Sequence, residues 1–143
     1  MATKVFKFIK DKLFVDSIVF IRNNVIEPLS KLIIIDYGSN SNGSYIKYGN
    51  GDMICYKTIN VSSNITNRWG NMYESTSAVS LGNWPVEFKD TPTINVNKTS
   101  GQGSWLQLIN GLSKTSCGNT YFVSAVSSSV TTNLNIIGIG KWK

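Results

Sequence analysis

The chain contains no histidine among its 143 residues. This absence removes the commonest general base at neutral pH, the usual nitrogen ligand of zinc and every Ser-His triad. Carboxylate pairs remain as an acid–base option, and residues 41–143 offer only Asp52, Glu74, Glu87 and Asp90. Asp52 falls in an expected turn, and Glu87 and Asp90 flank Phe88, which favours solvated surface charges over a catalytic pair. We therefore expect no enzyme activity, no bound metal and no cofactor.

Arginine is almost absent, because the net charge of +6 comes mainly from lysines and only Arg22 and Arg68 are arginines. The lysines are scattered along the chain, whereas nucleic-acid-binding proteins gather Lys and Arg on one face or stripe. The sequence thus argues against a nucleic-acid partner. A diffuse positive field instead suits anionic polymers such as phosphate-bearing cell-wall glycans.

Cysteine is scarce as well, with Cys55 and Cys117 the two in the chain. They are too few for a metal finger or a disulfide scaffold, so we expect two buried thiols, with a disulfide between them as the alternative. Asp16 and Arg22 interrupt the apolar residues near the N-terminus, and no small-residue cleavage site follows. No apolar run approaches the ~20 residues of a membrane span. We expect neither a signal peptide nor membrane insertion.

Apolar residues crowd the chain before residue 36, at spacings of three and four that predict a helix over residues 11–26. Pro28 and many β-branched residues oppose a longer helix, and residues 5–8 alternate as a strand does. Such a helix must pack on its own domain, on copies of itself or on another protein. The polar residues 38–43 predict a linker, which favours an anchoring and oligomerisation segment over residues 1–40. Its docking stripe is Phe14, Ile18, Ile21, Val25, Leu29 and Leu32.

Residues 41–143 show the alternation and turn spacing of an all-β domain. Only 15% of the chain is charged, and Ser, Thr and Asn are abundant, as on the exposed faces of sheets. Strands are expected at residues 44–48, 52–59, 72–80, 91–98, 105–112, 120–127 and 133–139, with turns at 62–70, 99–103, 113–119 and 128–132. The fold class that follows is mainly β: an antiparallel β-sandwich knob after a short helical or mixed anchoring segment.

Residues 81–92 predict a corner of this sandwich. Pro85 and Pro92 lack a backbone donor and suit a strand edge or start, while Trp84 and Phe88 can turn into the core. We expect this corner to be structural.

Four other side chains, in or near expected loops and strand ends, are candidate ligand-binding residues. Trp and Tyr faces stack on sugar C–H surfaces while neighbouring polar groups hold hydroxyls. Core packing is the alternative for each aromatic, because large aromatics dominate sandwich cores. The candidates are Arg68, Trp69, Tyr73 and Trp105, of which the adjacent pair Arg68 and Trp69 is the most suggestive.

Residues 42–48, Asn-Gly-Ser-Tyr-Ile-Lys-Tyr, and residues 51–56, Gly-Asp-Met-Ile-Cys-Tyr, together resemble the start of a C-terminal domain of bacteriophage tail-fibre proteins. Residues 69–73, the corner at 84–92 and the ending at 139–143 are similar to the same family. The resemblance covers about residues 41–143, and it is carried by the order and spacing of short motifs. The corner is also similar to the H-type lectin domain, a six-stranded sandwich that trimerises and binds sugars.

The resemblance implies a trimeric knob on a virion fibre that contacts the host surface. Because only some forty residues precede the knob, we expect a short head or tail fibre, with residues 1–40 docked on a capsid or tail protein. Host attachment would then use a cell-surface glycan, and the protein would be made in the host cytoplasm and reside in the virion. The alternative is a free H-type lectin-like carbohydrate-binding module, which has no use for an apolar arm. A carboxylate-dependent glycan hydrolase is the third reading.

Overall fold

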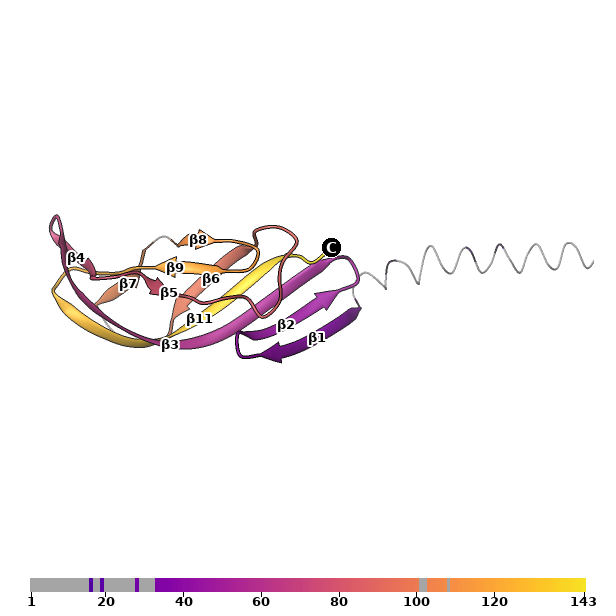
Figure 1. Ribbon diagram of the computed structural model, residues 1–143, viewed down its shortest axis with the longest axis horizontal. Helices are drawn as coiled ribbons and strands as arrows, with labels where there is room; N and C mark the ends of the chain where they lie inside the picture. The colour runs from indigo at the N-terminus through magenta and orange to yellow at the C-terminus, as the bar shows by residue number, and fades with distance from the viewer. Residues whose placement is uncertain (1–15, 17–18, 20–27, 29–32, 101–102, 108) are drawn as a thin grey trace, which may run out of the picture.

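A computed structural model describes residues 16, 19, 28, 33–100, 103–107 and 109–143. The described chain is mainly β and forms a sandwich of curled antiparallel sheets, as the sequence predicts (Figure 1). The expected helix over residues 11–26 falls almost entirely outside the described residues and stays a prediction. The same holds for the docking stripe of Phe14, Ile18, Ile21, Val25, Leu29 and Leu32.

Within the described residues, the larger sheet has eight strands. Its main path follows the order β1 (Ile34–Asn40), β2 (Gly43–Tyr48), β3 (Asp52–Trp69), β4 (Met72–Ser75), β10 (Phe122–Ser124) and β7 (Ser104–Leu106). Two further strands continue the sheet on the other side of β3, namely β11 (Ser128–Lys141) and β6 (Thr93–Lys98). The smaller sheet consists of β5 (Val79–Ser80), β9 (Cys117–Thr120) and β8 (Asn110–Leu112).

The two long strands β3 and β11 form the spine of the molecule (Figure 1). They pair without interruption from Asp52 opposite Lys141 to Ile65 opposite Ser128. The turn expected at residues 128–132 is therefore wrong, and the one expected at 62–70 is confirmed only at Gly70, because this Ser-, Thr- and Asn-rich sequence continues both strands. The outward positions of both segments are polar, and their side chains pair across the strands, as Ser62 Oγ does with Thr131 Oγ1 at 2.8 Å.

The β1–β2 hairpin replaces the linker expected at residues 38–43. Asn40 pairs with Gly43, and the side-chain oxygen of Asn40 accepts a 2.8 Å hydrogen bond from the backbone N–H of Asn42. Gly43 has a φ of 126°, and a Cβ there would lie 2.7 Å from the carbonyl oxygen of Tyr56. The linker prediction was wrong because Gly, Ser and Asn form tight turns as readily as flexible segments.

The strands expected at residues 72–80 and 105–112 are each divided in two, and the strand expected at 120–127 is replaced by two strands over 117–124, the first of which begins inside the turn expected at 113–119. In each case one part joins the larger sheet and the other joins the smaller sheet: β4 and β5, β7 and β8, and β10 and β9. Among the described strands the chain thus crosses between the sheets four times, counting the corner that leads from β5 back to β6, and these crossings hold the two layers together. The hydroxyl of Thr120, at one crossing, donates to the carbonyl oxygen of Gln107, at another, over 2.9 Å.

The corner at residues 81–92 is confirmed as part of the core. Trp84 and Phe88 are buried, and their rings meet edge to face with centroids 5.4 Å apart. The indole N–H of Trp84 donates to the carbonyl oxygen of Ser113 at 3.2 Å. Pro92 is buried directly before β6 begins. The corner covers β11 at Gly138, where a Cβ would lie 2.6 Å from the Trp84 ring.

Candidate functional site

The molecule has two ends, which we call the base and the tip (Figure 1). The base is where β1 begins and the chain ends, since the backbone N–H of Trp142 donates to the carbonyl oxygen of Gly51 at 3.0 Å. The tip is where β3 turns into β4 at Gly70. Between them runs β3, whose 18 residues span roughly 55 Å at about 3.3 Å per residue.

All four candidate ligand-binding residues lie at the tip, but on two faces of the sheet. Arg68 pairs with Tyr73, whereas Trp105 pairs with Val123, which in turn pairs with Glu74. Directly paired residues of antiparallel strands share a face, and neighbours along a strand lie on opposite faces. Trp69 and Trp105 therefore share the outer face, while Arg68 and Tyr73 belong to the face that turns toward the core.

The core-facing pair has structural partners. Tyr73 is half-buried and packs against the hydrophobic core. The Nε of Arg68 donates to the carbonyl oxygen of Gly70 at 3.2 Å, within the same turn. The structure thus separates Arg68 from Trp69, the pair that the sequence made most suggestive.

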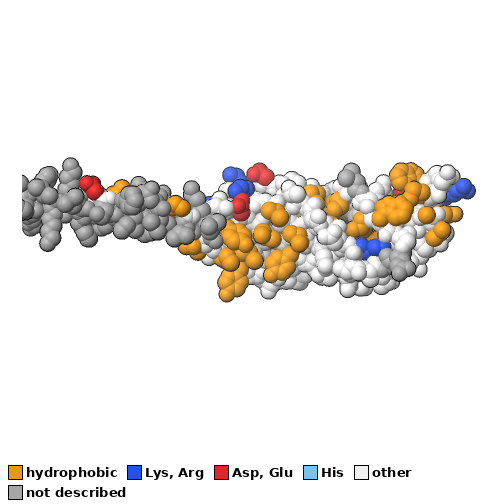
Figure 2. Space-filling model, turned by 180° about the vertical axis from the view of Figure 1, so that it is seen from behind, with side chains coloured by type: hydrophobic (Ala, Val, Ile, Leu, Met, Phe, Trp, Pro, Cys, Tyr) orange, Lys and Arg blue, Asp and Glu red, His pale blue; other side chains and the backbone are white. Residues whose placement is uncertain are grey.

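The outer face of the tip carries an exposed aromatic surface. Trp69 is 53% exposed and Trp105 48% exposed, and Met72 pairs with Trp69 on the same face. Glu74 accepts a 2.9 Å hydrogen bond from the side-chain amide of Asn67. Figure 2 shows hydrophobic side chains gathered at this end of the molecule. We call this set the tip surface: Asn67, Trp69, Met72, Glu74 and Trp105.

Sequence reasoning missed Asn67, Met72 and Glu74 as neighbours of the two tryptophans. The reason is an irregularity in β3, where Ile65 pairs with Ser75 but Asn67 already pairs with Glu74. This bulge shifts the alternation by one residue, so Asn67 and Trp69 face outward. The rule that successive strand residues alternate between the two faces of a sheet does not show from the sequence where a bulge lies.

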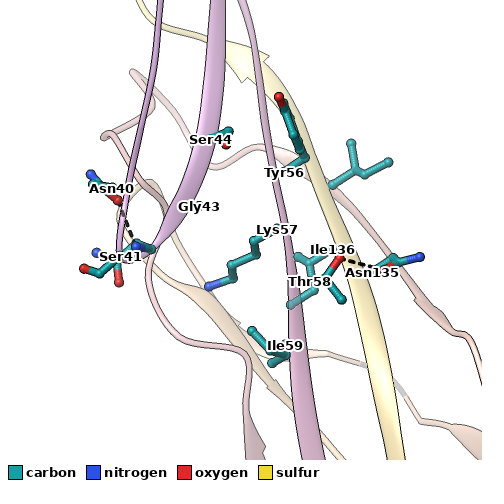
Figure 3. A pocket seen from close by; sticks show the side chains of 12 residues that line it. Asn40, Ser41, Gly43, Ser44, Tyr56, Lys57, Thr58, Ile59, Asn135 and Ile136 are labelled. Carbon is teal, nitrogen blue, oxygen red and sulfur yellow. Dashed lines mark hydrogen bonds between the residues drawn. The ribbon is translucent and has the colours of Figure 1, made fainter.

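A separate hollow of about 560 Å³ lies where the β1–β2 turn meets β3 (Figure 3). Its wall includes Tyr56 and Thr58 of β3 and Asn135 of β11, and Thr58 donates to Asn135 at 2.9 Å. Lys57 is the one ionisable side chain in the lining besides Tyr56, and its Nζ donates to the carbonyl oxygen of Asn83 at 2.8 Å. The lining of the hollow therefore combines neutral polar groups with the ammonium group of Lys57, and it holds no acid–base pair.

Three of the carboxylates considered for catalysis, Asp52, Glu74 and Glu87, lie in surface ion pairs or hydrogen bonds. The hydrogen bond from Lys141 lowers the pKa of Asp52, the opposite of what a general acid needs. Glu87 contacts Lys114 at 2.8 Å, and both side chains are exposed. In the part of the chain that the structure describes, no three His, Cys, Asp or Glu residues gather as metal ligands. Among the same residues, no helix has the length and hydrophobicity to cross a bilayer.

The two cysteines are free and buried, which confirms the first of the two interpretations of their role. Burial raises the pKa of the Cys55 thiol to about 12. Burial also raises the pKa of the Cys117 thiol. Because the thiolate is the reactive form, neither native thiol is poised for chemistry in the folded protein.

No family model and no curated protein matches the sequence. Two solved structures are similar to the fold. Both are pyocin fibres. The chain is 12% identical to an N-truncated R1-type pyocin tail fibre, with a TM-score of 0.48, and the match covers 83% of this chain and 92% of that one. It is 13% identical to the C-terminal residues 323–701 of the R1 pyocin fibre of P. aeruginosa, with a TM-score of 0.45, over 83% of this chain and 30% of that one. At these TM-scores the similarity assigns no function to this chain.

Proposed function

We propose that this chain is a virion fibre protein of a bacteriophage, on a short head or tail fibre, whose tip surface attaches to a host cell-surface glycan. In this proposal the knob is trimeric, and residues 1–40 dock on a capsid or tail protein. The observation that carries it is the position of Trp69 and Trp105. Both are about half exposed at the tip, the end away from β1.

The positions of the two ends of the molecule support this arrangement. The segment proposed to dock is joined to the knob through β1, so it leaves the knob at the base. A ligand surface at the opposite end would face outward from a particle. The tip surface also combines the groups that sugar binding uses, namely two exposed indoles beside a carboxylate and an amide.

Binding without catalysis fits the same surface. Glu74 is the one carboxylate of the tip surface, and it is hydrogen-bonded to Asn67. Glycoside hydrolysis uses a pair of carboxyl groups flanking the scissile bond. The proposal is therefore attachment to an intact glycan.

Replacing Trp69 and Trp105 together with alanine is expected to abolish attachment while leaving the fold intact. Both side chains are about half exposed, and stacking on an indole contributes about 1 kcal/mol or more per ring. The measurement is binding of the full chain to an array of bacterial surface glycans, with thermal unfolding as the check on folding. Val126→Ala is the matched control, because Val126 is a 62% exposed apolar residue outside the tip surface. Undiminished binding by the double variant would place the ligand elsewhere.

A further inference from the structure

One face of the larger sheet carries no charged side chain over most of its length. Along β3 its outward positions run from Ile54 to Asn64, and along β11 from Ser129 to Ile139. They hold only Ile, Tyr, Thr, Asn and Ser. The adjoining outward positions of β1, β2 and β6 are uncharged as well. We call these positions the uncharged face.

The uncharged face is exposed to solvent along the described strands. Tyr56 is 46% exposed and Ile137, which pairs with it, is 40% exposed. A second row crosses four strands, from Tyr37 through Ile46 and Ile54 to Ile139, with the outermost side chains 78% and 54% exposed. Figure 2 shows hydrophobic side chains gathered in the half of the molecule nearer the base. Contiguous apolar patches of this kind mark interaction surfaces.

Charged side chains are missing from this face although they are present at its borders. The chain is 15% charged, and a solvated sheet face usually carries charged side chains. Here the charges stop at the borders of the face: Asp52 and Lys141 form an ion pair at 2.5 Å at the base, and Glu74 lies at the tip. Depletion of charged residues is the compositional mark of the centre of a protein–protein interface.

The lack of charge on this face favours a second copy of the chain as the partner that binds there. Each chain has a net charge of +6, so two copies repel each other unless they meet where neither carries charge. A negatively charged partner, in contrast, would be drawn to the lysines, which lie off this face. We propose that copies of this chain associate by packing their uncharged faces together. That the copies number three rests on the proposed function.

The polar part of the face is prepared for burial. Asn60 donates to Asn133 at 2.8 Å and Thr58 donates to Asn135 at 2.9 Å, in each case across the β3–β11 pair. Polar groups that already have partners lose little when water is removed, whereas unpaired ones cost about 1–3 kcal/mol each. These bonds satisfy part of the polar groups on the face, and the remaining side-chain amide groups of Asn133 and Asn135 would find partners on the neighbouring copy.

The size of the face also fits a stable interface. Strand and residue spacings give a sheet area of roughly 600 Å², close to the ~800 Å² per partner of a standard interface. The hollow of about 560 Å³ is lined in part by Tyr56, Thr58, Asn135 and Ile137 of this face. We expect it to receive an apolar side chain of the neighbouring copy.

The test measures how fast an introduced thiol on this face reacts with a maleimide in the full chain. The two native cysteines are buried and serve as a silent background. Thr58→Cys is a near-isosteric change on the uncharged face, and Val126→Cys, at a 62% exposed position outside it, is the matched control. We expect Thr58→Cys to label about tenfold more slowly than Val126→Cys, since reaction requires the copies to separate. In denaturant both should label at one rate.

A second variant tests whether the slow labelling of the introduced thiol depends on association of the copies. Adding Ile137→Lys to Thr58→Cys places like charges together at the interface, so labelling should rise to the rate of Val126→Cys, whereas Ile137→Leu should leave it slow. Equal native rates for Thr58→Cys and Val126→Cys overturn the inference, as does slow labelling that Ile137→Lys does not relieve. If light scattering still gives a trimer in either case, the assignment of the face has failed and the trimer of the proposed function stands.

Discussion

Replacing Phe88 with alanine is expected to lower the free energy of unfolding by about 3–5 kcal/mol. Phe88 is 1% exposed, and its ring packs edge to face against Trp84. It also contacts β11, because a Cβ at Gly140 would lie 2.9 Å from the Phe88 ring. The backbone N–H groups of Trp84, Phe88 and Lys89 donate to Thr115, Lys114 and Lys141, which fixes the corner in place and leaves it little freedom to collapse onto the space. Chemical denaturation of the full chain measures the effect.

Phe88→Leu is the control, since leucine fills most of the same volume and should cost less than half as much. Attachment should fall only as far as the folded fraction falls. A Phe88→Ala variant of unchanged stability that no longer attached to cells would make the corner a binding site and contradict its structural role.

Replacing Gly138 with alanine is expected to lower the free energy of unfolding by about 2 kcal/mol, through overpacking. The new Cβ would lie 2.6 Å from the Trp84 ring. That ring is 4% exposed and is held by its hydrogen bond to Ser113, so it has little room to move. Gly138 sits in the middle of the sheet, paired with both Cys55 and Ile94, and β11 cannot retreat either.

A double-mutant cycle tests this cause. Trp84→Phe removes the part of the ring nearest to Gly138, so Gly138→Ala should cost much less in that background than in the native chain. Equal costs in the two backgrounds would show that the glycine is needed for its backbone and not for the space it leaves.

The corner was predictable from sequence because its signals are local. Prolines without a backbone donor and aromatics four residues apart allow few conformations. As expected, Trp84 and Phe88 are buried and Pro92 lies directly before β6. The full length of β3 and β11 was not predictable. Ser, Thr and Asn are common both in turns and on the exposed face of a strand. Only the pairing of residues about seventy positions apart decides whether such a segment is a turn or a strand.

The tip surface could likewise be predicted only in part from the sequence. Trp69 and Trp105 are far apart in sequence, and they share a face through two intervening strands and a bulge near Thr66. The sequence marked both as aromatic and near turns, which was enough to name them. It also marked Arg68 and Tyr73, because nothing local distinguishes the outer face from the inner one. The uncharged face left one sequence signal, the absence of charge from residues 128–140.

The central claim is that this chain is a trimeric attachment protein, and the molar mass of the full chain in solution tests it most directly. Size-exclusion chromatography with light scattering should give three times the chain mass of 15.8 kDa, unchanged on dilution across the micromolar range. A monomer would contradict the account, and a monomer that still bound glycans through Trp69 and Trp105 would identify a free carbohydrate-binding module instead.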